Sequence, residues 1–517
     1  MNEAQQAGLQ IDWAGLAPMI IVFVAAFVGL LVEAAVPRAR RLVLQVALAV
    51  AALAAAFVAV VLNAGKSAAA FSIEGTGLGS IVLDGPGLFL QGTLAILAII
   101  AVLLLAERRT TRGGDFVAEA AVVADSAADK ARQREDGATE IFPLTLFAVG
   151  GMMMFVTSGD LLTMFVALEM LSLPLYLLCG LAKRRRLISQ EAALKYFLLG
   201  AFASAFYVYG MAMLYGFAGT VDLAGINQAG ISSNQPRLLL YIGVAMIAVA
   251  LLFKAAAVPF HMWTPDVYTG APTPVTALMA ACVKVAAFGG LLRVFNVGLA
   301  SSAWDWHLIL TVIAVATMLG GAIFAVTQRN IKRLLAYSSI ANAGYLLIGV
   351  IALGEAVGQT MFYLAAYGFT VIAAFAVISL VRDGDEEATH LARWAGLGKK
   401  SAGTAAVVTV LMLALAGLPF TSGFTAKFGL FAAALEAGEV GLVIVGVVSS
   451  AILSFPYLKV VVLLWLNEPA PDAPTVNLPS PMAGTVVAVG VAATILLGVA
   501  PGQLLDIVNQ ASTFLNT

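Results

Sequence analysis

Four ionisable side chains occur in stretches of sequence that are otherwise almost entirely apolar. Glu169 lies in TMFVALEMLSLPLY, Lys254 in ALLFKAAAVPFHMW, Lys284 in TALMAACVKVAAFGGLL and Lys427 in LAGLPFTSGFTAKFGLF. A charge at the centre of a bilayer costs about 2.5–3.5 kcal/mol on insertion scales, so a chain rarely retains such residues for packing alone. A buried lysine can release and recapture a proton when a nearby carboxylate moves, because burial favours the neutral amine and the carboxylate favours the ammonium. The pattern therefore predicts proton transfer, with Glu169 and Lys254 as the switching pair, and with Lys284 as the central relay. Lys427 would be the exit-side group.

Some of these side chains have a second interpretation. Glu169 could be paired with a lysine for structural reasons alone. Lys195 lies five residues into its helix, beside the basic loop KRRR, so its amine either reaches the membrane surface or joins the proton path. His261, next to Pro259, is a further candidate for the cytoplasmic half of the path. Lys459 lies near the end of its apolar stretch and is expected to be interfacial.

Two prolines interrupt the apolar stretches that carry Lys254 and Lys427. Pro259 removes the helix bond to the carbonyl of Ala255, and Pro419 removes the bond to that of Leu415. Broken helices at membrane depth are tolerated only where protein or water satisfies the freed backbone groups. In transporters, paired breaks of this kind mark the transport path. Two unrelated proline kinks are the alternative interpretation.

Composition predicts that these residues are held by membrane-spanning helices. Of the 517 residues, 61% are hydrophobic and only 11% are charged, whereas a soluble chain carries about 25% charged residues. A span needs about 20 apolar residues. The sequence predicts fourteen spans, near 16–36, 42–62, 87–106, 141–158, 161–182, 190–217, 238–262, 274–295, 308–327, 333–353, 359–381, 403–435, 440–466 and 481–500.

The basic residues predict how these spans are oriented. Twenty of the 28 lysines and arginines fall in alternate loops, whereas only Lys66, Arg237 and Arg293 fall in the loops between them. Because cytoplasmic loops carry an excess of Lys and Arg, the basic loops are predicted to be cytoplasmic and both termini periplasmic.

The fold class predicted is an all-α polytopic membrane protein with about 14 transmembrane helices. The two proline breaks fall in spans seven and twelve, an odd offset, which predicts two inverted five-helix repeats that each contain a broken helix. The predicted parts are three N-terminal helices (1–106), a hydrophilic cytoplasmic insertion (107–140), a first repeat (141–295, helices 4–8), a second repeat (308–466, helices 9–13) and a C-terminal helix with its tail (481–517).

The remaining features exclude several classes of function. The net charge of -1 gives no basic surface for nucleic acid. Cys179 and Cys282 are far apart and match no disulfide, metal or iron–sulfur spacing. No Gly-rich phosphate loop is present. We therefore expect no metal, cofactor or redox centre in this chain.

Three long motifs resemble the antiporter-like membrane subunits of respiratory complex I. They are LLFKAAAVPFHMWTPDVYTGAPTPVTALMAACVKVAAFGGLLRVF (251–295), QRNIKRLLAYSSIANAGYLLIGV (328–350) and GLPFTSGFTAKFGLF (417–431). The resemblance covers roughly 140–466 and is greatest to the N-type subunits. M-type subunits usually have glutamate at the position matching Lys427, and L-type subunits carry a long lateral C-terminal helix for which this chain has no room.

The resemblance implies a translocase subunit of NADH:quinone oxidoreductase that couples electron transfer in other subunits to proton pumping. The key ionisable positions of the family match Glu169, Lys254, Lys284 and Lys427. FMN, iron–sulfur clusters and quinone are then expected in partner subunits, which include an M-type subunit and the small membrane subunits. The implied location is the bacterial plasma membrane. A subunit of a multisubunit sodium/proton antiporter, which shares these motifs, and a purely scaffolding subunit are the alternatives.

Overall fold

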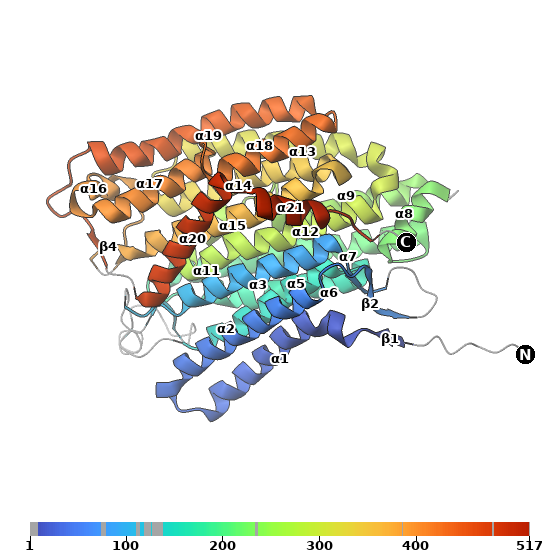
Figure 1. The fold of residues 1–517 in the computed structure, drawn as a ribbon, viewed down its shortest axis with the longest axis horizontal. Helices are drawn as coiled ribbons and strands as arrows, with labels where there is room; N and C mark the ends of the chain where they lie inside the picture. Colours follow the sequence, from blue (N-terminus) through green and yellow to red (C-terminus); the bar gives the residue numbers. More distant parts are fainter. Residues whose placement is uncertain are drawn as a thin grey trace, which may run out of the picture.

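In a computed structural model of the protein, long apolar helices pack side by side (Figure 1). The structure describes residues 9–73, 79–109, 114–117, 126, 138–232, 236–384, 386–477 and 480–515. Within these ranges, twelve helices are long and apolar enough to cross a membrane, and two shorter apolar helices accompany them. The prediction of an all-α membrane protein is therefore confirmed. Most of the predicted insertion at 107–140 lies outside the described residues.

Each of the fourteen predicted spans coincides with a helix or with a broken pair of helices. The first six are α1 (Trp13–Ala35), α2 (Arg38–Leu62), α3 (Gly85–Leu105), α5 (Ile141–Thr157), α6 (Leu161–Cys179) and α7 (Arg186–Ala218). After the short helix α8 (Leu223–Ser232) come α9 (Arg237–Ala255) with α10 (Trp263–Gly270), and α11 (Thr273–Leu278) with α12 (Lys284–Arg293). The later ones are α13 (Ala303–Val326), α14 (Ile331–Ile351), α15 (Val357–Leu380), α17 (Ala402–Ala416) with α18 (Ser422–Glu436), α19 (Val440–Leu466) and α20 (Pro481–Val499).

Both predicted helix breaks lie in irregular segments. The chain leaves α9 at Ala256, whose φ of 63° is left-handed, and resumes as α10. It leaves α17 at Gly417, with φ 85°, and resumes as α18. The two segments contain Pro259 and Pro419. The neighbours of the broken helices also correspond, because α7 packs against α9 and α10, whereas α15 packs against α17 and α18. This order supports the proposed repeats, whose boundaries stay a prediction.

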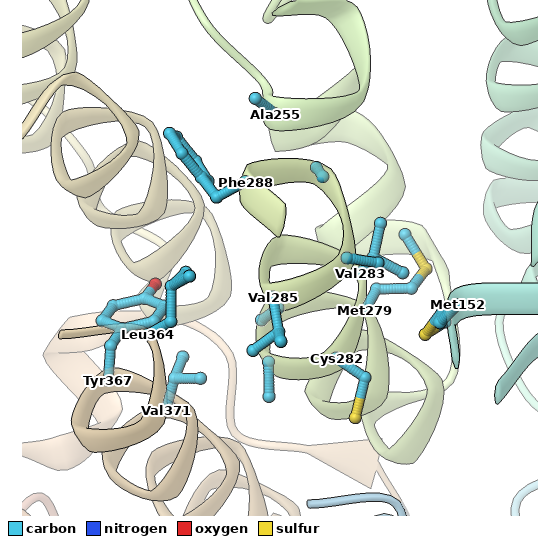
Figure 2. Close-up of a cluster of buried hydrophobic side chains, with 14 of the residues drawn as sticks. Met152, Ala255, Met279, Cys282, Val283, Val285, Phe288, Leu364, Tyr367 and Val371 are labelled. Carbon is cyan, nitrogen blue, oxygen red and sulfur yellow. The ribbon is translucent and has the colours of Figure 1, made fainter. Parts of the chain in front are cut away.

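The eighth span forms the buried centre of the molecule. A π-helical turn at Met279–Val283 joins α11 to α12, and a second one follows α12 at Val294–Gly298. Every residue in the most apolar stretch of this span is buried. Figure 2 shows Met279, Cys282 and Phe288 of this span among side chains from α5, α9 and α15.

The C-terminal part differs from the prediction of one helix followed by a tail. After α20 the chain breaks at Ala500 and Pro501 and forms a second helix, α21 (Gly502–Gln510), which packs against α15. α20 runs obliquely to its neighbours, and α21 continues toward the end of the bundle that carries α8 and β1 (Figure 1).

Short strands outside the helices were also not predicted. One antiparallel sheet has the order β1 (Leu9–Ile11), β2 (Ala68–Ile73) and β3 (Ile81–Leu83). The other, at the opposite end of the bundle, contains β5 (Glu386–Glu387), β4 (Val381–Asp383) and β6 (Thr475–Val476). Three short 3-10 turns (Ala300–Ser302, Leu353–Ala356, Leu391–Trp394) and α16 (Leu397–Lys400) complete the described elements.

Candidate proton-transfer site

Lys254 lies in the last turn of α9, directly before the first helix break, and its side chain is buried. Its Nζ donates to Ser172 Oγ of α6 at 2.7 Å and to Tyr196 OH of α7 at 3.1 Å. The same Nζ lies 5.2 Å from the centre of the Tyr196 ring, within the range of a cation–π contact. Two neutral hydroxyls and an aromatic face therefore hold this amine.

Neighbouring helices satisfy backbone groups that the first break exposes. Trp263 Nε1 of α10 donates to the carbonyl of Phe253 at 3.0 Å, and the Val258 N–H donates to Thr317 Oγ1 of α13 at 3.0 Å. Irregular backbone within a bilayer requires such partners. His261 belongs to the same segment and is buried, and its Nδ1 has no hydrogen-bond partner in the described part of the chain.

Glu169 is close to Lys254 in the fold but is not paired with it. It lies on α6 one turn before Ser172, is only half-buried, and accepts a hydrogen bond from Ser204 of α7. Among the described residues no ion pair joins Glu169 to Lys254, and the Ser172 hydroxyl that binds Lys254 itself donates to the Leu168 carbonyl of α6. Glu169 also borders an exposed apolar stripe of α6, the α6 stripe, made of Leu162, Val166, Leu173 and Leu177.

Lys284 is the first residue of α12, immediately after the π-helical turn. Its side chain is 4% exposed, and its Nζ donates to the backbone carbonyl of Ser339 of α14 at 2.7 Å. The side chains drawn around this span in Figure 2 are apolar except for Tyr367 of α15. The lysine predicted to be the central relay is therefore held by a carbonyl oxygen, and no carboxylate is paired with it in the described part of the chain.

Lys427 lies in α18 and reaches back to the second helix break. Its buried Nζ donates to the carbonyls of Leu415 (3.3 Å) and Ala416 (3.1 Å) and to Ser450 Oγ of α19 (2.9 Å). The carbonyl of Leu415 is the group that Pro419 deprives of its helical donor. The lysine therefore also satisfies the backbone at the break, a dual role that Lys254 does not share.

A narrow cavity extends from Lys427 toward α14 and α15. Along it, Tyr363 OH donates to Asn342 Oδ1 at 2.5 Å, and Asn342 Nδ2 donates to the Ser338 carbonyl at 2.8 Å. The hydroxyls of Ser339 on α14 and Tyr367 on α15 are also buried, and Ser339 is the residue whose carbonyl binds Lys284. The polar lining consists of Asn342, Tyr363, Tyr367, Thr370, Ser422 and Lys427.

These hydroxyl and amide residues are not among those predicted from the sequence. Ser338, Asn342 and Tyr345 recur every three or four residues in α14, and Tyr363, Tyr367 and Thr370 do so in α15. Polar residues that recur at helical spacing within a predicted membrane span were the available signal.

Lys195 belongs to a separate, more exposed cluster at the end of the bundle that carries the basic loops. Its side chain is 41% exposed and pairs with Glu191 at 2.7 Å and with Asp266 at 2.8 Å. Arg333 of α14 pairs with the other oxygen of Asp266 at 2.8 Å. This geometry agrees with an amine that reaches the membrane surface.

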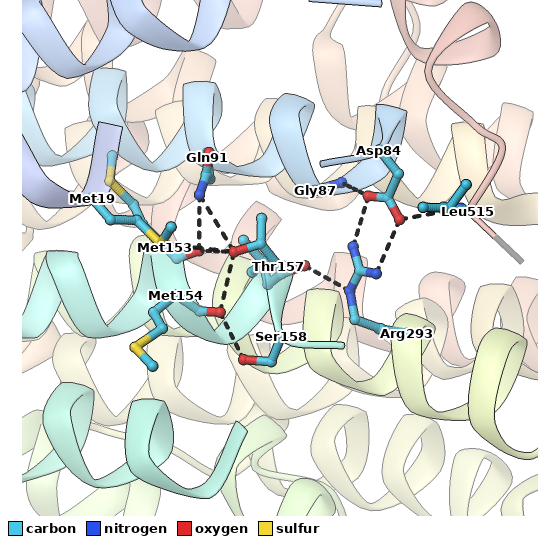
Figure 3. Close-up of polar contacts among 11 residues, drawn as sticks. Met19, Asp84, Gly87, Gln91, Met153, Met154, Thr157, Ser158, Arg293 and Leu515 are labelled. Carbon is cyan, nitrogen blue, oxygen red and sulfur yellow. Dashed lines mark hydrogen bonds and ion pairs between the residues drawn. The ribbon is translucent and has the colours of Figure 1, made fainter. Parts of the chain in front are cut away.

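Arg293, predicted to lie in a loop, is instead fully buried at the end of the helix that carries Lys284. Its terminal nitrogens bind both oxygens of Asp84, at 2.7 and 3.0 Å, and its Nε donates to the Val156 carbonyl at 2.9 Å (Figure 3). The ring of Phe514 lies 5.2 Å from the guanidinium, and the Leu515 N–H donates to Asp84 at 3.3 Å. This ion pair, which sequence reasoning missed, joins α3, α5, α12 and the C-terminal segment.

Within the described ranges, no group of three or more His, Cys, Asp or Glu side chains is placed to hold a metal ion. Cys179 and Cys282 are both buried and unpaired. The three buried amines of Lys254, Lys284 and Lys427 are each held by hydroxyl or carbonyl oxygens.

Comparison with known proteins identifies the family. The family model described as "NADH:quinone oxidoreductase/Mrp antiporter, TM" matches residues 158–453. NADH-quinone oxidoreductase subunit N of Salinispora arenicola is 57% identical over 514 residues, which cover 98% of each chain. Subunit N of Rhodococcus opacus is 52% identical over 98% of this chain and 96% of its own.

Solved structures agree with this relationship. A chain of respiratory complex I from Thermus thermophilus with bound aureothin is 32% identical over 95% of this chain and 98% of its own, with a TM-score of 0.75. A chain of the Mrp complex from Dietzia sp. DQ12-45-1b has a TM-score of 0.80 but is 22% identical, which shows a shared fold alone. From its identity to the N subunits over nearly its whole length, the chain belongs to the family of NADH-quinone oxidoreductase N subunits.

Proposed function

We infer that this chain is a proton-translocating membrane subunit of NADH:quinone oxidoreductase, which couples electron transfer in other subunits to proton movement. The observation that carries this inference is the set of three buried lysines, Lys254, Lys284 and Lys427, each held by neutral oxygen atoms. A buried charge paired with an opposite charge leaves a costly unpaired partner when it is removed. An amine held by neutral oxygens can lose and regain its proton without leaving such a partner.

The proposed route begins at Glu169 and Lys254. Ser172, bound to Lys254 and one turn from Glu169, would pass a proton between them when Glu169 changes its partner. The proton would then reach Lys284, which is the central relay. In each transfer an oxygen or nitrogen gains one proton as its neighbour loses one, so no other bond changes.

From Lys284 the route would continue along hydroxyls to the second break. Ser339 supplies the carbonyl that holds Lys284, and its own hydroxyl and that of Tyr367 would be the next to accept and donate the proton. Tyr367 also lines the cavity beside Lys427. Lys427 would release the proton on the exit side.

We further propose that the basic loops face the cytoplasm of a bacterium, that the chain lies in its plasma membrane, and that both termini are outside. β1 and α21 lie at one end of the bundle (Figure 1), which supports placing the two termini on the same side of the membrane. Its neighbours would be the M-type and small membrane subunits, and FMN, iron–sulfur clusters and quinone would be bound by partner subunits. The α6 stripe beside Glu169 supports a contact with lipid or with such a neighbour.

The test is Lys284→Ala in the assembled complex, measured as protons translocated per NADH oxidised in membrane vesicles. We expect a large loss of coupled activity and of translocation. Lys459→Ala is the matched control, because Lys459 is a lysine of a membrane helix whose side chain is exposed, and it should leave both unchanged. Undiminished translocation in an assembled Lys284→Ala complex would instead support a scaffolding role.

The sodium/proton antiporter alternative has less support. It is favoured by a shared fold at 22% identity, whereas identities above 50% over nearly the full length are to N subunits. Proton translocation that depends on NADH and not on sodium would separate the two functions.

A further inference from the structure

α20 lies outside both proposed repeats, yet it delivers a fully buried hydroxyl to the second of them. Thr494 of α20 is 0% exposed, and its Oγ1 lies 2.9 Å from Thr370 Oγ1 of α15. Thr370 Oγ1 in turn lies 3.4 Å from Ser422 Oγ, at the start of α18. These three residues, which we call the hydroxyl triad, join the last long helix to the second helix break.

Two glycines bring α20 close enough for this contact. A Cβ at Gly490 would lie 2.5 Å from Ala373 Cβ of α15, and one at Gly498 would lie 2.4 Å from backbone atoms of Thr421 at the break. Gly490, Thr494 and Gly498 are four residues apart and so share one face of α20. Small residues at this spacing let membrane helices approach closely. Packing explains the glycines, but a valine would fill the place of Thr494 equally well, so packing does not explain the hydroxyl.

The hydroxyl triad is continuous with the cavity beside Lys427. Thr370 and Ser422 both line that cavity, whereas Thr494 lies behind Thr370 and does not. Thr494 therefore has no direct access to Lys427 and can act on it only through Thr370.

Thr494 can determine which way the Thr370 hydroxyl points. Thr494 Oγ1 is within reach of the Gly490 carbonyl at 2.7 Å, and Thr370 Oγ1 is within reach of the Ala366 carbonyl at 3.0 Å. When Thr494 donates to Gly490, Thr370 can donate to Thr494. When Thr494 donates to Thr370, the Thr370 hydrogen can point to Ser422 on the cavity side. A hydroxyl has one hydrogen to donate, so Thr370 presents an acceptor oxygen to the cavity in the first arrangement and a donor hydrogen in the second.

We propose that Thr494 is a positioning residue for proton transfer at Lys427, which it affects by setting the hydrogen bond of Thr370. This inference rests on the proposed function. It assigns to α20 a part in the second half of the proton path. Without the Thr494 hydroxyl, Thr370 would be left with the Ala366 carbonyl as its partner behind the cavity, and the exchange of hydrogen-bond direction would be lost.

The test compares Thr494→Val, which keeps the shape, with Thr494→Ser, which keeps the hydroxyl, in the complete complex. We expect Thr494→Val to lower NADH-driven proton translocation about fivefold, the factor that corresponds to one net hydrogen bond, at an unchanged level of assembled complex. Thr494→Ser should stay near the unsubstituted protein. The control is Thr485→Val, because Thr485 is an exposed threonine of the same helix that bonds only to its own helix.

Two results would overturn the proposal. One is full translocation in Thr494→Val, and the other is an equal loss in Thr494→Ser, which would assign the effect to side-chain shape. If Thr494→Val does not assemble, Ser422→Ala removes a hydroxyl from the other end of the triad, and full translocation in that variant would also contradict the proposal. Lys284→Ala tests the proposed function separately from the role of Thr494. If translocation is lost in Lys284→Ala but not in Thr494→Val, the role of Thr494 is refuted and the proposed function is not.

Discussion

Replacing Asp84 by Asn removes the counter-charge of a fully buried guanidinium while keeping the shape of the side chain. Asp84 and Arg293 are each 1% exposed. The carboxylate accepts hydrogen bonds from both terminal nitrogens of Arg293 and from the backbone N–H groups of Gly87 (2.9 Å) and Leu515 (3.3 Å). An amide has one acceptor oxygen in place of two, so one N–H of Arg293 would face another donor.

The expected cost follows from this geometry. A hydrogen bond to a charged group contributes about 1.5–3 kcal/mol, and removing one partner of a buried ion pair costs about 3–5 kcal/mol because the other charge remains. We expect Asp84→Asn to destabilise the chain by about 3–5 kcal/mol. Asp305→Asn is the control, because Asp305 pairs at 3.4 Å with Arg237, whose side chain is 60% exposed. Such a surface pair contributes about 0–1 kcal/mol.

The two buried cysteines provide an assay that is specific to this chain. Cys179 and Cys282 are 0% exposed, so they react with a maleimide only when the helices around them separate. Membranes containing the complex would be heated in steps and labelled, and the two cysteine peptides quantified by mass spectrometry. Asp84→Asn should be labelled at a clearly lower temperature than Asp305→Asn. Identical labelling temperatures for Asp84→Asn and the unsubstituted chain would refute the argument that the ion pair secures this end of the bundle.

Two further predictions concern packing and pH. Gly498→Ala should destabilise the chain by about 1–3 kcal/mol, because the added Cβ would overlap the backbone of Thr421. Gly441→Ala is the control and should not destabilise it, because an added Cβ there has no neighbour within 4 Å. The two variants would be compared by the temperature at which the cysteines are labelled. Burial raises the pKa of Glu387, but Lys332 at 3.1 Å and other partners outweigh it, so the pKa is lowered. A carboxylate whose pKa is lowered by folding stabilises the folded state at a pH above its pKa in the unfolded chain, which is about 4.3. This stabilisation is lost as the pH falls through the pKa of the folded state. The stability difference between Glu387→Gln and the unsubstituted chain should therefore be constant from pH 8 to pH 6 and shrink only below about pH 4, as followed by thermal labelling.

Local patterns were sufficient to predict the burial of the three lysines and the two helix breaks. Lys254, Lys284 and Lys427 each lie within an apolar stretch too long to be a loop, and all three are buried. A proline has no N–H to donate to the carbonyl four residues before it, so the loss of the helical donor to the Leu415 carbonyl was also predictable. That Lys427 binds this carbonyl depends on the fold of the segment between them, which the local pattern does not specify.

Features that depend on distant partners or on helix rotation were not predictable. Nothing near Asp84 or Arg293 in the sequence indicates that the two meet, because 209 positions separate them. The half-burial of Glu169 depends on which face of α6 turns outward. The sequence does not indicate this face, because α6 has apolar residues on all of its faces. The second C-terminal helix, α21, follows a proline and is too short and polar to resemble a span.

The separation between Asp84 and Arg293 also has a consequence for biosynthesis. Asp84 is made early, but its counter-charge follows only after 209 further residues, and the Leu515 N–H that binds it follows 431 residues after it. α3 therefore enters the membrane before Arg293 has been made. Until then the Asp84 carboxylate at the start of α3 is in water or bound to another group. The buried ion pair can form only after α12 has been inserted, and Phe514 and Leu515 can contact it only after α20 and α21 have been made.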